Sequence, residues 1–344
     1  MSREKIIILG IESSCDETAA AVTADGSEIL SSVVASQADL HERFGGVVPE
    51  IASRAHVEKI LPIVSEAMEK AGVNAGQIHA VATANQPGLT IALMVGVTAA
   101  KTLAWAWNKP LIAVNHVHAH LQSALLGRES IQLPAVALIV SGGHTLLYDV
   151  ESPLDLRLLG STIDDAAGEA FDKVASILHL PYPGGPSIEK AAREGNAGAI
   201  DFPRSLLEKD SLDFSFSGLK TAVLYHCQGQ DMKGINRVDK MSFREIADIA
   251  ASFQAAVIDV LIEKTRRAID RVEAKTVLLG GGVAANGVLR EAVISLCKQR
   301  GLTLLIAPRP LCTDNAVMVA SLAYLKYQAG LFAELSLEPK ASLG

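Results

Sequence analysis

Three histidines at alternate positions follow a short apolar run, and they are the residues whose spacing most clearly permits chemistry. Residues 111–114 are aliphatic, Asn115 ends the run, and His116, His118 and His120 follow. The run predicts a buried strand, and Asn115, a good N-cap, predicts that a helix begins there. In that helix His116 and His120 share one face, while His118 points about 200° away. The pair can chelate a divalent metal; solvated histidines at a helix start are the alternative.

A carboxylate near the end of the chain is the candidate for a third ligand. Asp314 stands in the segment LeuCysThrAspAsn, where the last helix is expected to begin. Its functional role would be to complete a site with His116 and His120, and the alternative is an N-capping Asp. Two histidines and one carboxylate that leave open positions suit Fe(II), and they also suit catalytic Zn²⁺.

Glycine-rich turns after apolar strands predict a place for a phosphate or a nucleoside. One comprises Ile139, Val140, Ser141, Gly142 and Gly143, and another is the Gly280–Gly282 run before a predicted helix that includes Asn286. Small residues let backbone N–H groups approach an anion, and a helix N-terminus favours negative charge. A third stretch, 182–186, is expected to be a tight loop. Together the turns indicate a two-lobed nucleotide-binding protein with its cleft between the lobes.

The elements that must position these residues occur in two similar halves. Strands are predicted within 6–35 and again within 135–163, each time as three short strands joined by tight turns. Helices are expected at 53–71, 89–107, 243–271, 284–300 and 314–329, and further strands at 80–84, 276–279 and 302–306. The repeated three-stranded meander indicates a duplicated architecture. Strands alternating with helices predict an α/β fold with mixed sheets.

Composition narrows the function classes. The 344 residues carry a formal net charge of −7, which argues against nucleic-acid binding through bulk positive charge. The four cysteines form no CxxC pair, as expected for a cytoplasmic protein with reduced thiols. No signal peptide is expected, and 89–107 is predicted to be a buried helix and not a membrane span. No HExxH, GxSxG or Walker A pattern is present.

Nine ordered motifs, between about Ile6 and Tyr327, closely resemble those of the bacterial TsaD family, formerly called Gcp or O-sialoglycoprotein endopeptidase. They lie at 10–19, 44–56, 115–120, 140–145, 166–174, 182–186, 214–221, 280–286 and 312–315. The resemblance implies the two-lobed actin/sugar-kinase/Hsp70-like (ASKHA) fold, in agreement with the duplicated meander. We expect one lobe from residues 1–131 with 313–344, and the other from residues 132–312.

The resemblance also implies an activity, a tRNA threonylcarbamoyltransferase that uses threonylcarbamoyl-adenylate and releases AMP. By motif match, the metal ligands would be His116, His120 and Asp314, holding one Fe(II) or Zn²⁺. The adenylate or ATP site would comprise Ile139, Val140, Ser141, Gly142, Gly143, Asp172, Gly185, Glu189 and Asn286. Asp16 and Glu17 are the candidates for a general base.

Partners and rival functions follow from the same resemblance. The family works on tRNA together with a TsaB-like paralogue and a TsaE-like ATPase. The predicted helices near 53–71 and 89–107 are candidate docking faces, and simple packing on the core is the alternative. A metal-dependent endopeptidase is the rival enzyme, but the sequence shows no base beside the metal ligands. A non-catalytic ATP-binding scaffold would leave the two histidines and Asp314 unexplained. Lys220 is either a tRNA-phosphate contact or a surface cation.

Overall fold

The computed structural model describes residues 4–128, 130–206, 208, 210–229 and 237–342. The chain forms two compact units, Met1–Glu129 with Ala307–Gly344, and Ser130–Ile306. Each unit contains one five-stranded sheet with parallel and antiparallel pairs. The α/β class with mixed sheets is therefore confirmed.

The sheet of the first unit has the strand order β3-β2-β1-β4-β5. β1 (Ile7–Glu12), β2 (Glu17–Ala24) and β3 (Glu28–Ser36) form the predicted meander, and β1 also pairs in parallel with β4 (Ala80–Gln86). β5 (Leu111–Asn115) continues the parallel part beside β4. The carboxyl ends of β1, β4 and β5 therefore meet at one edge, where a sheet of this type usually carries its site.

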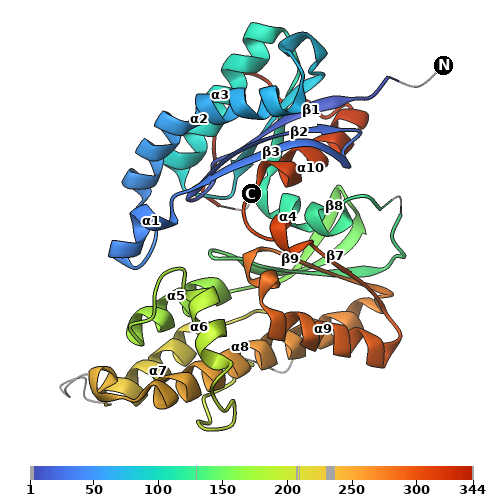
Figure 1. Cartoon of the computed structure of the whole chain (residues 1–344). Coiled ribbons are helices and arrows are strands. Elements are labelled where there is room, and N and C mark those ends of the chain that lie inside the picture. Colours follow the sequence, from blue (N-terminus) through green and yellow to red (C-terminus); the bar gives the residue numbers. More distant parts are fainter. Residues whose placement is uncertain (1–3, 129, 207, 209, 230–236, 343–344) are drawn as a thin grey trace. The chain divides into compact units, whose positions relative to one another are not determined.

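Helices cover both faces of this sheet (Figure 1). α2 (Pro49–Ala71) and α3 (Thr90–Trp107) pack on one face, and α4 (His116–Leu125) and α10 (Ala316–Gln328) lie on the other. The short helix α1 (Ala38–His41) leads from β3 towards α2. α10 approaches β1 so closely that a Cβ on Gly10 would lie 2.6 Å from the Ala316 carbonyl oxygen. Only glycine permits that contact.

Both α2 and α3 leave apolar side chains exposed to solvent. α2 begins at Pro49 because proline suits the first helical turn, and its Val57 and Leu61 are 63% and 59% exposed, whereas Ile60 and Val64 are buried. α3 is only partly buried, with Ile91, Met94 and Trp105 exposed. Among the described residues α3 is also the one helix long and apolar enough to cross a membrane, a test that core helices of soluble proteins pass as well.

The second unit repeats the topology of the first. Its sheet has the order β10-β9-β6-β7-β8, formed by β6 (Ala135–Val140), β7 (Thr145–Ser152), β8 (Asp155–Ser161), β9 (Thr276–Gly280) and β10 (Thr303–Ile306). Read from β8, this order matches β3-β2-β1-β4-β5. The duplicated architecture is therefore confirmed. The helices of this unit are α5 (Ala167–Ile177), α6 (Gly184–Ala192), α7 (Ser217–Gln228), α8 (Phe243–Val272) and α9 (Gly287–Arg300).

Two local predictions in this unit are wrong. Within the stretch 182–186, residues 184–186 are the start of α6 and not part of a loop, because the Asp172 carboxylate accepts a hydrogen bond from the Gly184 N–H at 2.7 Å and fixes the first turn. The helix expected from Ala284 begins at Gly287 after the 3-10 helix η4 (Gly282–Ala285), because the Asn286 side chain caps it.

Candidate metal centre

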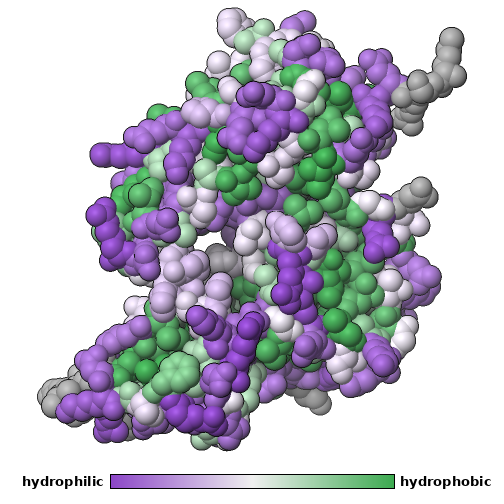
Figure 2. Space-filling view, viewed as in Figure 1, coloured by the Kyte–Doolittle hydropathy of each residue, from purple (hydrophilic) through white to green (hydrophobic). Residues whose placement is uncertain are grey.

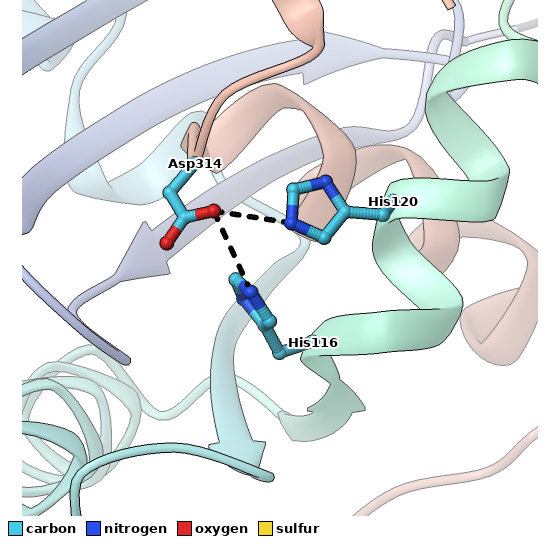
Figure 3. A group of neighbouring side chains, drawn as sticks. All are labelled: His116, His120 and Asp314. Atoms are coloured by element: carbon cyan, nitrogen blue, oxygen red, sulfur yellow. Dashed lines mark ion pairs between the residues drawn. The ribbon is translucent and has the colours of Figure 1, made fainter. Parts of the chain in front are cut away.

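The strand–helix junction at Asn115 places the two histidines. The Asn115 side chain accepts hydrogen bonds from the Val117 and His118 N–H groups at 2.9 and 3.1 Å, so α4 begins where the sequence predicts. His116 and His120 lie one turn apart on the same face of α4, and they are 4% and 0% exposed. Figure 3 shows both rings directed to one point beside the helix.

Asp314 completes the group from the segment before α10. Its Oδ1 lies 3.1 Å from His120 Nε2 and 3.5 Å from His116 Nε2 (Figure 3). The N-cap of α10 is the neighbouring Asn315, whose side chain accepts a hydrogen bond from the Met318 N–H at 3.0 Å. The alternative role of Asp314 as the capping residue is therefore wrong, and its carboxylate points to the histidines.

The donor set fits a divalent metal ion. The candidate ligand atoms of His116, His120 and Asp314 all lie within 4.8 Å of one another. Ligand atoms about 2.1 Å from one ion lie roughly 3.0–3.4 Å apart, close to the distances observed. Among the described residues, neither ring nitrogen of the buried His120 forms a hydrogen bond of regular geometry, although Nε2 lies 3.1 Å from Asp314 Oδ1. An ion bound between these two atoms would satisfy Nε2. The group could therefore hold a metal.

Glu12 orients His116 from the end of β1. Its Oε2 lies 3.0 Å from His116 Nδ1, its Oε1 accepts a hydrogen bond from the Ser14 N–H at 2.6 Å, and Ser14 Oγ is also 3.0 Å from that Nδ1. Nδ1 therefore carries the hydrogen, and Nε2 faces Asp314. Burial opposes a charge on His116, but the Asp314 and Glu12 carboxylates outweigh it and raise the pKa to about 9. The sequence signal for this contact is that Glu12 ends β1 and His116 directly follows β5, two parallel strands that lie on either side of β4.

Further carboxylates surround the group. Burial, followed by the charges of Asp314 and Asp16, raises the pKa of Glu17 to about 10. The same acidic neighbours and burial raise the pKa of the Cys15 thiol well above its usual range. Carboxylates gathered this closely repel one another, so a cation at the site would relieve the repulsion and lower the pKa of Glu17.

In the second unit, the two glycine-rich turns meet. Gly281 has φ +90°, and a Cβ on it would lie 2.4 Å from the Val140 carbonyl oxygen. Ile139 and Val140 are fully buried in β6 and support the turn through the pairing of β6 with β7 and β9. Gly142 and Gly143, which follow the buried Ser141, are exposed, and a Cβ on either would meet no atom within 4 Å. A Cβ on Gly185 or on Gly282 would likewise meet no atom within 4 Å.

Two further candidate residues of this unit, Asn286 and Glu189, form hydrogen bonds at the first turn of α9. Asn286 caps α9 and donates a hydrogen bond to Gln254 Oε1 at 2.8 Å, a partner that the sequence did not suggest. Glu189 Oε1 accepts a hydrogen bond from the Gly287 N–H at 3.2 Å, which links α6 to the same helix end. Lys220 forms an ion pair with Asp165 at 2.9 Å.

Solved structures share this fold at low sequence identity. The chain matches HypF from T. kodakarensis with a TM-score of 0.61 and 16% identity, over 95% of this chain and 48% of that one. It matches component A of the (R)-2-hydroxyglutaryl-CoA dehydratase of Acidaminococcus fermentans with a TM-score of 0.51 and 18% identity, over 94% and 99% of the two chains. These neighbours confirm the ASKHA fold.

Protein sequences show the family. Residues 28–321 match the TsaD family model, described as tRNA N6-adenosine threonylcarbamoyltransferase. The transferase of that name from Moorella thermoacetica is 54% identical over 96% of this chain and 94% of its own length. Its counterpart from Rhodopirellula baltica is 51% identical over 96% and 95%. The chain therefore belongs to the TsaD family of tRNA N6-adenosine threonylcarbamoyltransferases.

Proposed function

We propose that this chain transfers the threonylcarbamoyl group of L-threonylcarbamoyladenylate to the exocyclic N6 amine of the tRNA adenosine 3′ of the anticodon. The amine nitrogen attacks the carbamoyl carbonyl carbon, the bond from that carbon to the phosphate oxygen breaks, and AMP leaves with the bonding electrons. The amine loses one proton to a base. Family membership supports the reaction, and the convergence of His116, His120 and Asp314 is the structural observation that carries it.

We assign the metal to that group, with Fe(II) first and Zn²⁺ second, since two imidazoles and one carboxylate suit both ions. A bound ion would polarise the carbonyl or stabilise charge on the departing phosphate. Glu12 holds His116 in the orientation that ligation needs. Glu17, whose pKa is about 10, is protonated at neutral pH without a cation and can donate a hydrogen bond. Asp16 is then the candidate to accept the proton of the amine.

The adenylate is assigned to the glycine turns of the second unit. Gly142 and Gly143 at the end of segment 139–143, with Gly185 and Gly282, offer open space for the phosphate and nucleoside. The side chains of Asp172 in α5 and Glu189 in α6 accept hydrogen bonds from the first residues of α6 and α9, and Asn286 caps α9. Carboxylate and amide groups placed there can bond to ribose hydroxyls.

Gly142→Ala tests this assignment without disturbing the fold. The new methyl meets no protein atom within 4 Å, so stability is expected to stay unchanged, while the group it would block is the ligand. We expect AMP affinity, measured by calorimetry, to fall by roughly tenfold, as when a close contact is lost. Gly198→Ala in the same unit, where the new methyl would lie at an ordinary van der Waals distance of 3.6 Å from Asn196 Oδ1, is the control and should bind as wild type. Wild-type AMP affinity in both variants would mean that the nucleotide binds elsewhere.

The TsaB-like paralogue is proposed to dock on the first unit. Val57 and Leu61 of α2 and Ile91 and Met94 of α3 line one apolar groove, and all four are exposed. Figure 2 shows hydrophobic patches beside hydrophilic ones over these helices. An apolar surface of this kind suits a protein partner. A TsaE-like ATPase and a cytoplasmic location complete the proposal and rest on the family alone.

Mass spectrometry of tRNA nucleosides tests the function. Cells that lack their own enzyme would carry this chain intact or as His116→Ala, together with its partner proteins. Threonylcarbamoyladenosine restored by the intact chain and absent with His116→Ala would support the transferase. An intact chain that is soluble and folded but restores nothing would return attention to the peptidase and the scaffold.

A further inference from the structure

The turn 13–16, between β1 and β2, is held by three consecutive carbonyl groups. The Ser14 oxygen accepts a hydrogen bond from the Leu89 N–H at 2.8 Å, and the Asp16 oxygen accepts one from the Gln37 N–H at 3.1 Å. The Cys15 oxygen, between them, accepts from His56 Nε2 at 3.0 Å. His56 is thus the side chain that fixes the middle of the turn that carries Asp16 and leads into Glu17.

His56 can have only one hydrogen arrangement in this place. Its Nδ1 lies 2.8 Å from Thr18 Oγ1 and 3.3 Å from the amide nitrogen of Gln37, which is a donor. Nδ1 must therefore accept, and Nε2 carries the hydrogen that goes to the Cys15 oxygen. Burial lowers the pKa of His56, in agreement with a neutral ring.

A second histidine extends this arrangement to the segment before α2. His41 Nε2 lies 3.4 Å from Gln37 Oε1, and His41 Nδ1 accepts from the Val48 N–H at 3.3 Å. His56, Gln37 and His41 are each at most 1% exposed, and we call them the buried histidine network. Every donor in the network has an acceptor when both histidines carry a hydrogen on Nε2 and accept through Nδ1. The network connects the start of α2 to the turn 13–16.

We infer that His56 is a positioning residue for the proposed transfer, and that its Nε2–H holds the turn 13–16 so that Asp16 and Glu17 keep their places beside the metal group. The inference rests on the roles proposed for these two carboxylates. His56 is 0% exposed and cannot touch substrate, so it acts only through the turn. Losing the donor leaves the Cys15 carbonyl without its side-chain partner, which favours local opening of the turn.

Cys15 itself reports on the turn. Its side chain is partly exposed, whereas Cys312 is buried in the same unit. The experiment measures the alkylation rate of each cysteine by iodoacetamide at one pH, by peptide mass spectrometry, in the full-length chain. For His56→Ala we expect the Cys15 rate to rise about tenfold and the Cys312 rate to stay unchanged, as for loss of one buried hydrogen bond. His56→Gln keeps a side-chain N–H donor and should react nearly as wild type.

His79→Ala is the matched control. His79 also bonds to backbone in this unit, through Nδ1 to the Ile7 N–H at 3.0 Å, but at the opposite end of β1. It should leave Cys15 unchanged. An unchanged Cys15 rate in His56→Ala would overturn the inference. If Cys312 reacts faster as well, the variant has unfolded. The tautomer of His56 in the wild-type chain, measured by long-range ¹⁵N–¹H NMR, then decides: Nε2–H supports the inference and Nδ1–H overturns it.

Activity separates this inference from the proposed function. In His56→Ala, kcat per metal-loaded chain should fall about tenfold while the KM for tRNA stays unchanged, because the turn and not tRNA binding is affected. His56→Gln should recover most of that loss. If the wild-type chain forms no threonylcarbamoyladenosine, the proposed function fails, yet the alkylation rates still show whether His56 holds the turn.

Discussion

His120→Ala is expected to abolish metal binding and transfer together. His120 is fully buried, its Nε2 lies 3.1 Å from Asp314 Oδ1, and it is one of the three residues of the candidate ligand group. Loss of one of three ligands should weaken metal affinity by more than the roughly 10- to 100-fold that loss of an outer hydrogen-bond partner costs. Fe(II) or Zn²⁺ affinity, measured by competition with a chromophoric chelator, is the first readout. Formation of threonylcarbamoyladenosine is the second.

His118→Ala is the matched control for that experiment. His118 stands on the same helix, two residues from each ligand, but it belongs to a different face of α4. Burial and the neighbouring Lys326 charge lower the pKa of His118 to about 4, so its ring is neutral at pH 7, and its removal changes no charge there. Normal metal affinity is expected for this variant. If folded His120→Ala still binds the metal strongly, His120 is not a ligand and the proposed site is wrong.

The strand–helix unit around Asn115 could be predicted because its signals are local. Four aliphatic residues, one capping side chain and the helical period fix β5, the start of α4 and the shared face of His116 and His120. The repeated meander is also a local pattern, and its two copies have the same strand order in the two sheets. Fold class and duplication were therefore accessible from the sequence alone.

Contacts between distant segments were not accessible in the same way. Either Asp314 or Asn315 can cap a helix, and only the packed α10 shows that Asn315 does so. The contact from Glu12 to His116 spans 104 positions and depends on the parallel pairing of β1, β4 and β5. The helical period alone does not say which apolar residues of α2 a neighbouring helix covers. Val57 and Leu61 line a groove beside α3 and stay exposed, which only the packed structure shows.

Glu12 gives the second large effect that we expect, and it acts without being a ligand. It is 0% exposed, and its carboxylate receives hydrogen bonds from His116 Nδ1 and the Ser14 N–H. Glu12→Ala removes the acceptor that fixes the ring, so Nε2 loses its preferred direction towards Asp314. We expect metal affinity to fall by about 10- to 100-fold. Glu12→Gln keeps an acceptor oxygen but loses the charge, and its loss should be smaller.

Glu28→Gln provides the comparison on the same sheet. Glu28 pairs with Lys5 at the surface, where exposed ion pairs contribute little, so this variant should bind metal as wild type does. Chelator competition gives the affinities of the wild type and the three variants, and thermal unfolding of the metal-free chains shows whether each variant is folded. A graded order of wild type, Glu12→Gln and Glu12→Ala means that Glu12 orients and polarises His116. Wild-type affinity in folded Glu12→Ala would instead mean that α4 alone holds the ring in place.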